Sequence, residues 1–209
     1  MAEAKYFYIY GGTMNIEIRK LSPDLIDDYL DFFDNSAFSD GSDFAGCYCV
    51  WYYWTNELEK EHSSCPQNMK NSFKRNLAIN YIRQGKLNGF LAYSYGRVIG
   101  WCNAGLRQNY DRLSCKNNPD LWIDYDNEKV MSIVCYLVSP NMRGKGVATE
   151  LLKAVCKYAQ EDRYDYIEAY PVINEDGSPH YHGSFTMYEK QGFKIVKNDS
   201  TITIVRKYL

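Results

Sequence analysis

Residues 137–148 contain residue types suited to binding an anion. Arg143, Gly144, Lys145 and Gly146 lie between an apolar strand pattern and the start of a helical pattern. The first N–H groups of a helix have no intrahelical partner and the helix dipole adds partial positive charge, so a pyrophosphate fits there. Glycine lets the backbone approach the anion, and the two cations can add charge-assisted hydrogen bonds. The alternative is a pair of turn glycines in a solvated basic loop.

Two familiar phosphate-binding loops are excluded at this position. The Walker pattern GxxxxGK[ST] is absent from the chain, and no G-x-G-x-x-G follows the strand pattern. The segment therefore predicts an anion site of another type.

Two motifs give the chain its resemblance to a known family. Residues 143–148, R-G-K-G-V-A, fit the pattern [RQ]-x-x-G-x-[GA], and residues 187–193, M-Y-E-K-Q-G-F, are similar to L-Y-x-K-x-G-F. In this order, these are the two signatures of the GNAT superfamily of N-acetyltransferases. The chain resembles that superfamily over about residues 15–207, with residues 35–85 and 106–128 longer and less similar.

The resemblance implies a reaction and a set of site residues. Acetyl-CoA would be the acyl donor, and the backbones of Tyr136 and Val138 would hydrogen-bond its pantetheine arm. Tyr188 would lie near the thioester sulfur and donate a proton to the departing thiolate as a general acid. An aromatic core position is the alternative for Tyr188. The residues expected to cradle the pyrophosphate are Arg143, Gly144, Lys145, Gly146, Val147 and Ala148.

The chain departs from the family pattern at one cofactor position. Many members carry Asn seven residues before the tyrosine, whereas this chain has Tyr181, and the loop before it looks expanded. Asn174, further back in this loop, is a possible replacement, but the contact is not assigned to it.

An amine acceptor must lose a proton before it attacks the thioester, so a base or a water chain is needed. The candidate carboxylates are Glu168, Asp124, Asp126 and Glu128, although for each of them a solvated surface acid is the favoured interpretation. Cys135 suggests an acyl-cysteine intermediate, but its apolar surroundings should raise the pKa of the thiol. For His180 and His182 a surface or hydrogen-bonding role is favoured over catalysis.

An aromatic segment at 47–54 is the candidate wall of the acceptor pocket, with core packing as the alternative. Four acids flank it: Asp40, Asp43, Glu57 and Glu59. Acids together with aromatic faces favour a cationic acceptor. Amines of the polyamine, aminoglycoside or lysine type are therefore expected to be better substrates than anionic amino acids.

The expected elements place these residues in an α/β fold. Strand patterns occur at 15–21, 89–94, 97–104, 130–138, 166–172, 193–197 and 201–207. Helical patterns run from 23 to about 34, from 66 to about 84, from 147 to about 159 and from 184 to 190. The resemblance implies a mixed, mostly antiparallel sheet with a splayed parallel strand pair, flanked by helices. Residues 1–13 are interpreted as a flexible leader and residues 14–209 as a single domain.

Composition restricts the partners and the location. A net charge of −2 argues against a nucleic-acid binder, and no apolar run has the length of a membrane span. The seven cysteines include no pair of C-x-x-C motifs, so no metal site is expected and free thiols in the cytoplasm are favoured. The expected partner is a small-molecule or peptide amine, and a homodimer is left open. The alternative function is a non-catalytic acyl-CoA sensor or interaction module with the same fold.

Overall fold

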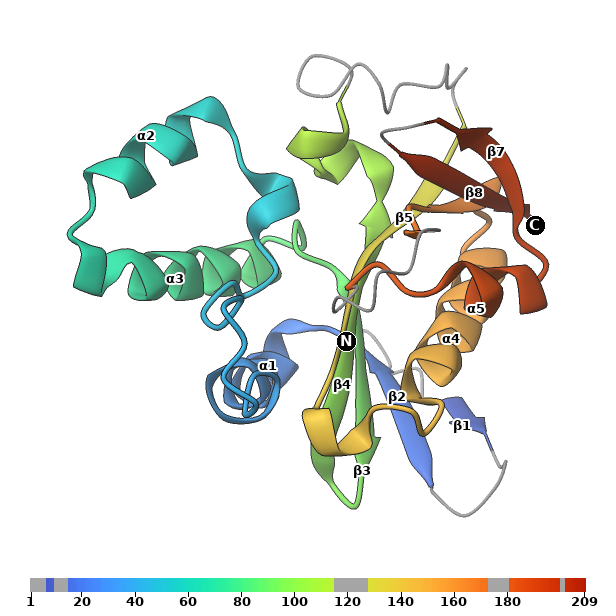
Figure 1. Ribbon diagram of the computed structural model, residues 1–209, viewed down its shortest axis with the longest axis horizontal. Coiled ribbons are helices and arrows are strands. Elements are labelled where there is room, and N and C mark those ends of the chain that lie inside the picture. Colours follow the sequence, from blue (N-terminus) through green and yellow to red (C-terminus); the bar gives the residue numbers. More distant parts are fainter. Residues whose placement is uncertain (1–6, 10–14, 115–127, 173–180, 200–201) are drawn as a thin grey trace.

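A mixed sheet organises the computed structural model, which describes residues 7–9, 15–114, 128–172, 181–199 and 202–209 (Figure 1). All neighbouring strands in it are antiparallel except β5 and β6, which are parallel. The predicted fold class is therefore confirmed. In spatial order the eight strands are β1 (Phe7–Ile9), β2 (Ile16–Lys20), β3 (Gly89–Ser94), β4 (Arg97–Leu106), β5 (Val130–Val138), β6 (Tyr166–Ala169), β8 (Thr203–Tyr208) and β7 (Lys194–Asn198).

Helices cover both faces of the sheet (Figure 1). Because strand side chains alternate between faces, Leu91 and Trp101 join the core beneath the first three helices, while Phe90 and Cys102 join the core beneath the last two. The helices on the first face are α1 (Ile26–Asp31), α2 (Asn56–Ser64) and α3 (Lys70–Arg83), and those on the second are α4 (Val147–Glu161) and α5 (Phe185–Lys190).

The parallel pair separates partway along its length. β5 and β6 pair from Val130 with Tyr166 as far as Ile133 with Ala169, and β5 then continues to Val138 without β6. A register shift opposite Asn103 and Ala104 leaves Val134 of β5 without a partner in β4. The splayed pair implied by the family resemblance is thus present, and it opens one side of β5 beyond Ile133.

Several predicted boundaries need correction. The strand predicted at 166–172 ends at Ala169, because the sheet has opened there and Pro171 cannot donate to a ladder. Helix α2 was not predicted, since it buries none of its residues and carries little apolar pattern. Within the predicted flexible leader, residues 7–9 form β1 and pair with β2. The single-domain boundary stays a prediction.

None of the helices among the described residues is long and apolar enough to cross a membrane.

Candidate active site

The turn from β5 into α4 has the backbone geometry of an anion site. Gly144 and Gly146 have φ angles of +73° and +83°, a region that side chains other than glycine rarely adopt. A Cβ atom added at either glycine would meet nothing within 4 Å, so both lie against open space. Gly146 is the N-cap of α4 and no side chain caps the helix. The first N–H groups of α4 therefore face a space that a phosphate can enter.

The side chains of the turn divide between this space and the core. Lys145 is exposed, whereas Val147 is buried and packs close to Gly100 of β4. Ala148 packs partly buried against the core beneath α4. Of these three side chains, only that of Lys145 is placed to meet an anion, and those of Val147 and Ala148 fix the start of the helix.

Arg143 is already engaged by a residue far away in the sequence. Its Nη1 lies 2.6 Å from Oδ2 of Asp40, and its Nε donates to the carbonyl of Val138 at 3.2 Å. The hydrogen bond from Arg143 lowers the pKa of Asp40 from its ordinary value. An anion at the turn would therefore share Arg143 with this carboxylate.

The open side of β5 is covered by residues 181–183. The N–H of Tyr136 donates to the carbonyl of Tyr181 at 2.6 Å, and Nδ1 of His182 lies 3.1 Å from the carbonyl of Val134. The hydrogen-bonding role predicted for His182 is confirmed. Tyr181 stands where many family members carry Asn, and its phenol lies 2.9 Å from the Ser42 hydroxyl.

Tyr188 on α5 is fully buried, close to the same segment. Its hydroxyl donates to the carbonyl of His182 at 2.8 Å. Burial raises the pKa of Tyr188 well above its ordinary value, so the phenol is protonated at neutral pH. Gly183 passes so close that an added Cβ would lie 3.1 Å from the Tyr188 ring. The phenol therefore carries the proton that a general acid needs, and in this structure it donates that proton in a hydrogen bond to the His182 carbonyl.

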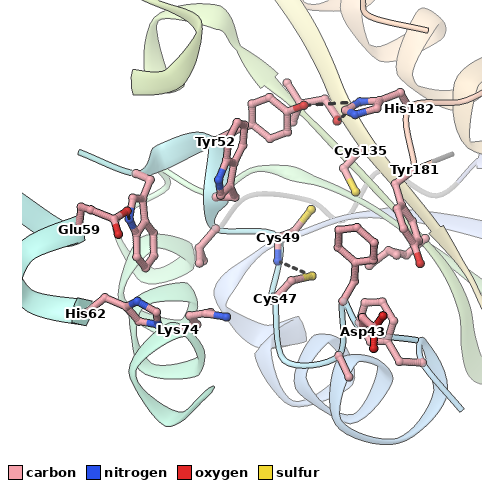
Figure 2. A pocket seen from close by; sticks show the side chains of 18 residues that line it. Asp43, Cys47, Cys49, Tyr52, Glu59, His62, Lys74, Cys135, Tyr181 and His182 are labelled. Atoms are coloured by element: carbon pink, nitrogen blue, oxygen red, sulfur yellow. Dashed lines mark hydrogen bonds between the residues drawn. The ribbon is translucent and has the colours of Figure 1, made fainter. Parts of the chain in front are cut away.

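A cavity of about 620 Å³ lies beside this opening (Figure 2). Its volume is in the range of small-molecule sites. Trp51, Tyr52 and Trp54 line it, whereas Tyr53 is fully buried and its hydroxyl bonds to Asn103 at 3.1 Å. Part of the aromatic segment therefore lines this cavity and part packs in the core, while the acceptor pocket stays a prediction. The complete lining is Phe38, Asp43, Phe44, Ala45, Cys47, Cys49, Val50, Trp51, Tyr52, Trp54, Glu59, His62, Lys74, Val134, Cys135, Leu137, Tyr181 and His182.

Two of the reactive groups considered from the sequence are placed unfavourably for catalysis. Glu168 is fully buried outside the cavity lining, and its oxygens accept hydrogen bonds from Arg206 at 2.8 Å and Tyr170 at 2.6 Å. The solvated surface position favoured for Glu168 is therefore wrong, and its place outside the cavity lining does not support the alternative role as base. A hydrogen bond with Cys49, followed by burial, raises the pKa of Cys135 well above its ordinary value. The expected weakness of Cys135 as a nucleophile is confirmed. Asp124, Asp126 and His180 lie outside the described residues.

Two polar residues of the cavity, His62 on α2 and Lys74 on α3, carry no sequence pattern that indicates a site. They are far from both motifs, and a half-buried charge on a helix looks like any solvated residue in a sequence. Only the folding of α2 and α3 beside the aromatic segment brings them to the site.

Comparison with known proteins connects this geometry to one family. The model of the acetyltransferase (GNAT) family matches residues 51–193. No curated protein matches the chain.

Solved structures with the same fold have low sequence identity. A GNAT-family acetyltransferase from Listeria monocytogenes is 16% identical with a TM-score of 0.59, covering 97% of this chain and 100% of its own. PaiA N-acetyltransferase from Thermoplasma acidophilum, solved with coenzyme A, is 18% identical with a TM-score of 0.52 over 94% and 100%. A Drosophila melanogaster polyamine N-acetyltransferase is 9% identical with a TM-score of 0.51 over 93% and 100%.

Proposed function

The chain belongs to the acetyltransferase (GNAT) family, and from this premise we propose that it transfers an acetyl group from acetyl-CoA to a primary amine of a small molecule or peptide. The observation that carries the proposal is the glycine turn at the start of α4 beside the opening between β5 and β6. β5 leads into this turn, its open side is covered by residues 181–183, and its residues Val134, Cys135 and Leu137 line a cavity of about 620 Å³. Coenzyme A in the PaiA structure supports the choice of donor.

Acetyl-CoA would be held by groups that the chain already presents. The N–H groups at the start of α4, with Arg143 and Lys145, would bind the pyrophosphate. The backbones of Tyr136 and Val138 would bind the pantetheine arm. Because Tyr181 now accepts the Tyr136 N–H, cofactor binding would exchange this hydrogen bond for one to the ligand.

The chemical step removes two protons from the acceptor nitrogen, one before the attack and one after it, to a base or a water chain, and supplies one proton to the leaving sulfur. The acceptor ammonium loses its proton to a base or a water chain, and the neutral nitrogen attacks the thioester carbonyl. A carbon–nitrogen bond forms, the carbon–sulfur bond breaks, and the sulfur leaves as a thiolate. Tyr188 would donate its phenolic proton to that thiolate once the hydrogen bond to His182 is exchanged.

A panel of primary amines tests this function. We expect at least one amine to increase thiol release from acetyl-CoA above the rate without acceptor, and mass spectrometry should find the amine heavier by one acetyl group. If acetyl-CoA binds by calorimetry while no amine in a broad panel is acetylated, the transferase proposal is wrong.

That outcome would favour the second candidate function, a sensor that binds acyl-CoA without catalysing transfer of the acyl group. One observation supports it: Tyr181 and His182 already hold the Tyr136 N–H and the Tyr188 hydroxyl, the groups that catalysis would use. A sensor would bind acetyl-CoA and change the position of residues 181–183 without releasing thiol.

The compartment is proposed from the cysteines. The six cysteines that the structure describes are all free thiols, which supports a reducing compartment such as the cytoplasm.

Separate roles are expected for the two tryptophans of the cavity wall. Trp51 is 54% exposed, so Trp51→Ala should raise the acceptor KM with little change in melting temperature. Trp54 is 6% exposed and its Nε1 donates to Glu59 at 2.6 Å, so Trp54→Ala should also destabilise the chain by about 3 kcal/mol. Tyr95→Ala, on the exposed turn between β3 and β4, is the control. An unchanged acceptor KM in the folded Trp51→Ala variant would remove Trp51 from the pocket.

A further inference from the structure

The cavity has two ends that differ in chemistry (Figure 2). Cys135 and Tyr181 lie at the end formed by β5, where the acyl group would arrive, and Asp43 lies on the same side. His62 and Lys74 lie at the other end, which is formed by α2 and α3. Tyr52 lies along the wall between these ends, and Trp54 lines the cavity with its ring packed against that of His62. An acceptor that fills the cavity therefore meets apolar walls along its body and polar groups at both tips.

The structure changes the charge argument for a cationic acceptor. Of the flanking acids, Asp40 is paired with Arg143 at 2.6 Å. Glu59 accepts a hydrogen bond from Trp54 and forms an ion pair with Arg112 at 3.7 Å. Both charges are thus compensated by the protein. Two of the flanking acids line the cavity: Asp43 at the end nearer β5, and Glu59, with its partners Trp54 and Arg112, at the end of His62 and Lys74.

Lys74 supplies a positive charge at the far end, which Glu59 also lines. Its side chain is half-buried, and it makes no ion pair or hydrogen bond with any residue in the described part of the chain. Burial raises the pKa of the neighbouring Cys47 to about 12, so that thiol is neutral and cannot balance the ammonium. A half-buried ammonium without a partner is costly, which makes it a favourable partner for an incoming anion.

His62 adds an unused polar atom at the same end. Its Nε2 is buried and has no hydrogen-bond partner among the described residues, while its ring packs 5.1 Å from that of Trp54. Burial, followed by the charges of Lys74 and Lys70, lowers the pKa of His62 from its ordinary value, and Glu59 opposes this. The imidazole is therefore mainly neutral at pH 7, and in the Nε2–H tautomer it can donate one hydrogen bond.

We propose that Lys74 and His62 form an anion subsite, and that the acceptor is an amine with a carboxylate at its far end. The carboxylate binds the Lys74 ammonium and, once the His62 ring turns to bring its buried Nε2–H to the cavity, that donor as well. The apolar body lies between the aromatic walls, and the amine points toward Asp43 and β5. This inference rests on the proposed function for the role of its ligand as an acceptor, although the subsite can be tested by binding alone.

A matched series of three compounds isolates the charge of the tail. The probes are 4-(aminomethyl)benzoate, 4-methylbenzylamine and 4-(aminomethyl)benzylamine, which share the amine and the ring and carry an anionic, a neutral and a cationic tail. Calorimetry with the wild-type chain should show the benzoate binding about tenfold to a hundredfold more tightly than the neutral compound, the range for one charge-assisted hydrogen bond. The cationic tail should bind most weakly.

Three variants assign the preference to the subsite. Lys74→Met should remove the advantage of the benzoate, and Lys74→Glu should reverse the order in favour of the cationic tail. His62→Gln should lose only part of the advantage, because an amide retains a donor. Lys60→Met is the matched control, since this exposed lysine of α2 lies outside the cavity lining and its loss should change nothing.

The outcomes separate the subsite from the catalytic function. Three results would overturn the subsite. The three compounds could bind equally well, none of them could bind, or the preference for the benzoate could survive in Lys74→Met. Tighter binding of the cationic tail to the wild-type chain would do so as well, and would restore the cationic acceptor expected from the sequence. If the benzoate preference depends on Lys74 but no probe is acetylated, the subsite stands and the proposed transfer to these amines is wrong.

Discussion

A folded Gly146→Glu variant is expected to bind acetyl-CoA at least about a hundredfold more weakly than the parent chain. Gly146 caps α4 with its Cα turned toward open space, so the added side chain has room but projects into the proposed pyrophosphate site. A carboxylate about 4 Å from a phosphate in a partly desolvated site costs up to about 4 kcal/mol per charge pair. The introduced carboxylate would also take up the positive end of the helix dipole that the phosphate would use. Isothermal titration calorimetry measures the effect directly.

Two control variants separate repulsion from backbone strain. Gly96→Glu makes the same substitution at a φ of +74° with open space around it, in the turn between β3 and β4, and should leave the affinity unchanged. Gly146→Ala introduces the strain without the charge and should weaken binding far less than Gly146→Glu. An acetyl-CoA affinity of Gly146→Glu equal to that of the parent would place the pyrophosphate elsewhere.

The elements that the sequence predicted well are those with a strong local pattern. The turn between β3 and β4 was expected at Tyr95 and Gly96, and both have positive φ angles of 49° and 74°, as a two-residue hairpin turn requires. The apolar run of β5 has the predicted bounds, because this strand is covered by helices on both faces. By contrast, α2 is held by its Thr55 cap and a few partly buried contacts, which leave little trace in the hydrophobic pattern.

The candidate site could be predicted where it is contiguous in sequence. The anion turn occupies adjacent residues, so its glycines and helix start were visible as a motif. The partners of its side chains could not be predicted from the motif, because Asp40, which pairs with Arg143, lies 103 residues away in the sequence. Glu168 was misjudged for the same reason: Arg206, which binds it, lies 38 residues further along the chain. The cavity combines side chains from α2, α3 and β5 with others from residues 38–54 and 181–182, and no local pattern predicts such an assembly.

Removal of the Tyr188 hydroxyl in Tyr188→Phe is expected to lower kcat by about a hundredfold, the usual contribution of a general acid, with little change in acetyl-CoA affinity. The phenol is fully buried and protonated, because burial raises its pKa, so a proton is available throughout the neutral range. A leaving thiolate competes with the His182 carbonyl for this proton, and as the stronger acceptor it would win once negative charge develops on sulfur. The phenylalanine ring preserves the packing against Tyr136 and Phe193.

A buried hydroxyl can also matter for stability alone, so the control must lose an equivalent hydrogen bond. Tyr110 is equally buried, and its hydroxyl donates to Asn103 at 2.9 Å in the core outside the cavity lining. Tyr110→Phe and Tyr188→Phe should each cost about 1 kcal/mol of stability, yet only the second should lower kcat. Steady-state kinetics with a saturating amine, together with calorimetry for acetyl-CoA, distinguish the two effects. A kcat for Tyr188→Phe within about twofold of the parent would show that the rate-limiting step does not use this proton, since it falls far short of a general acid's usual contribution.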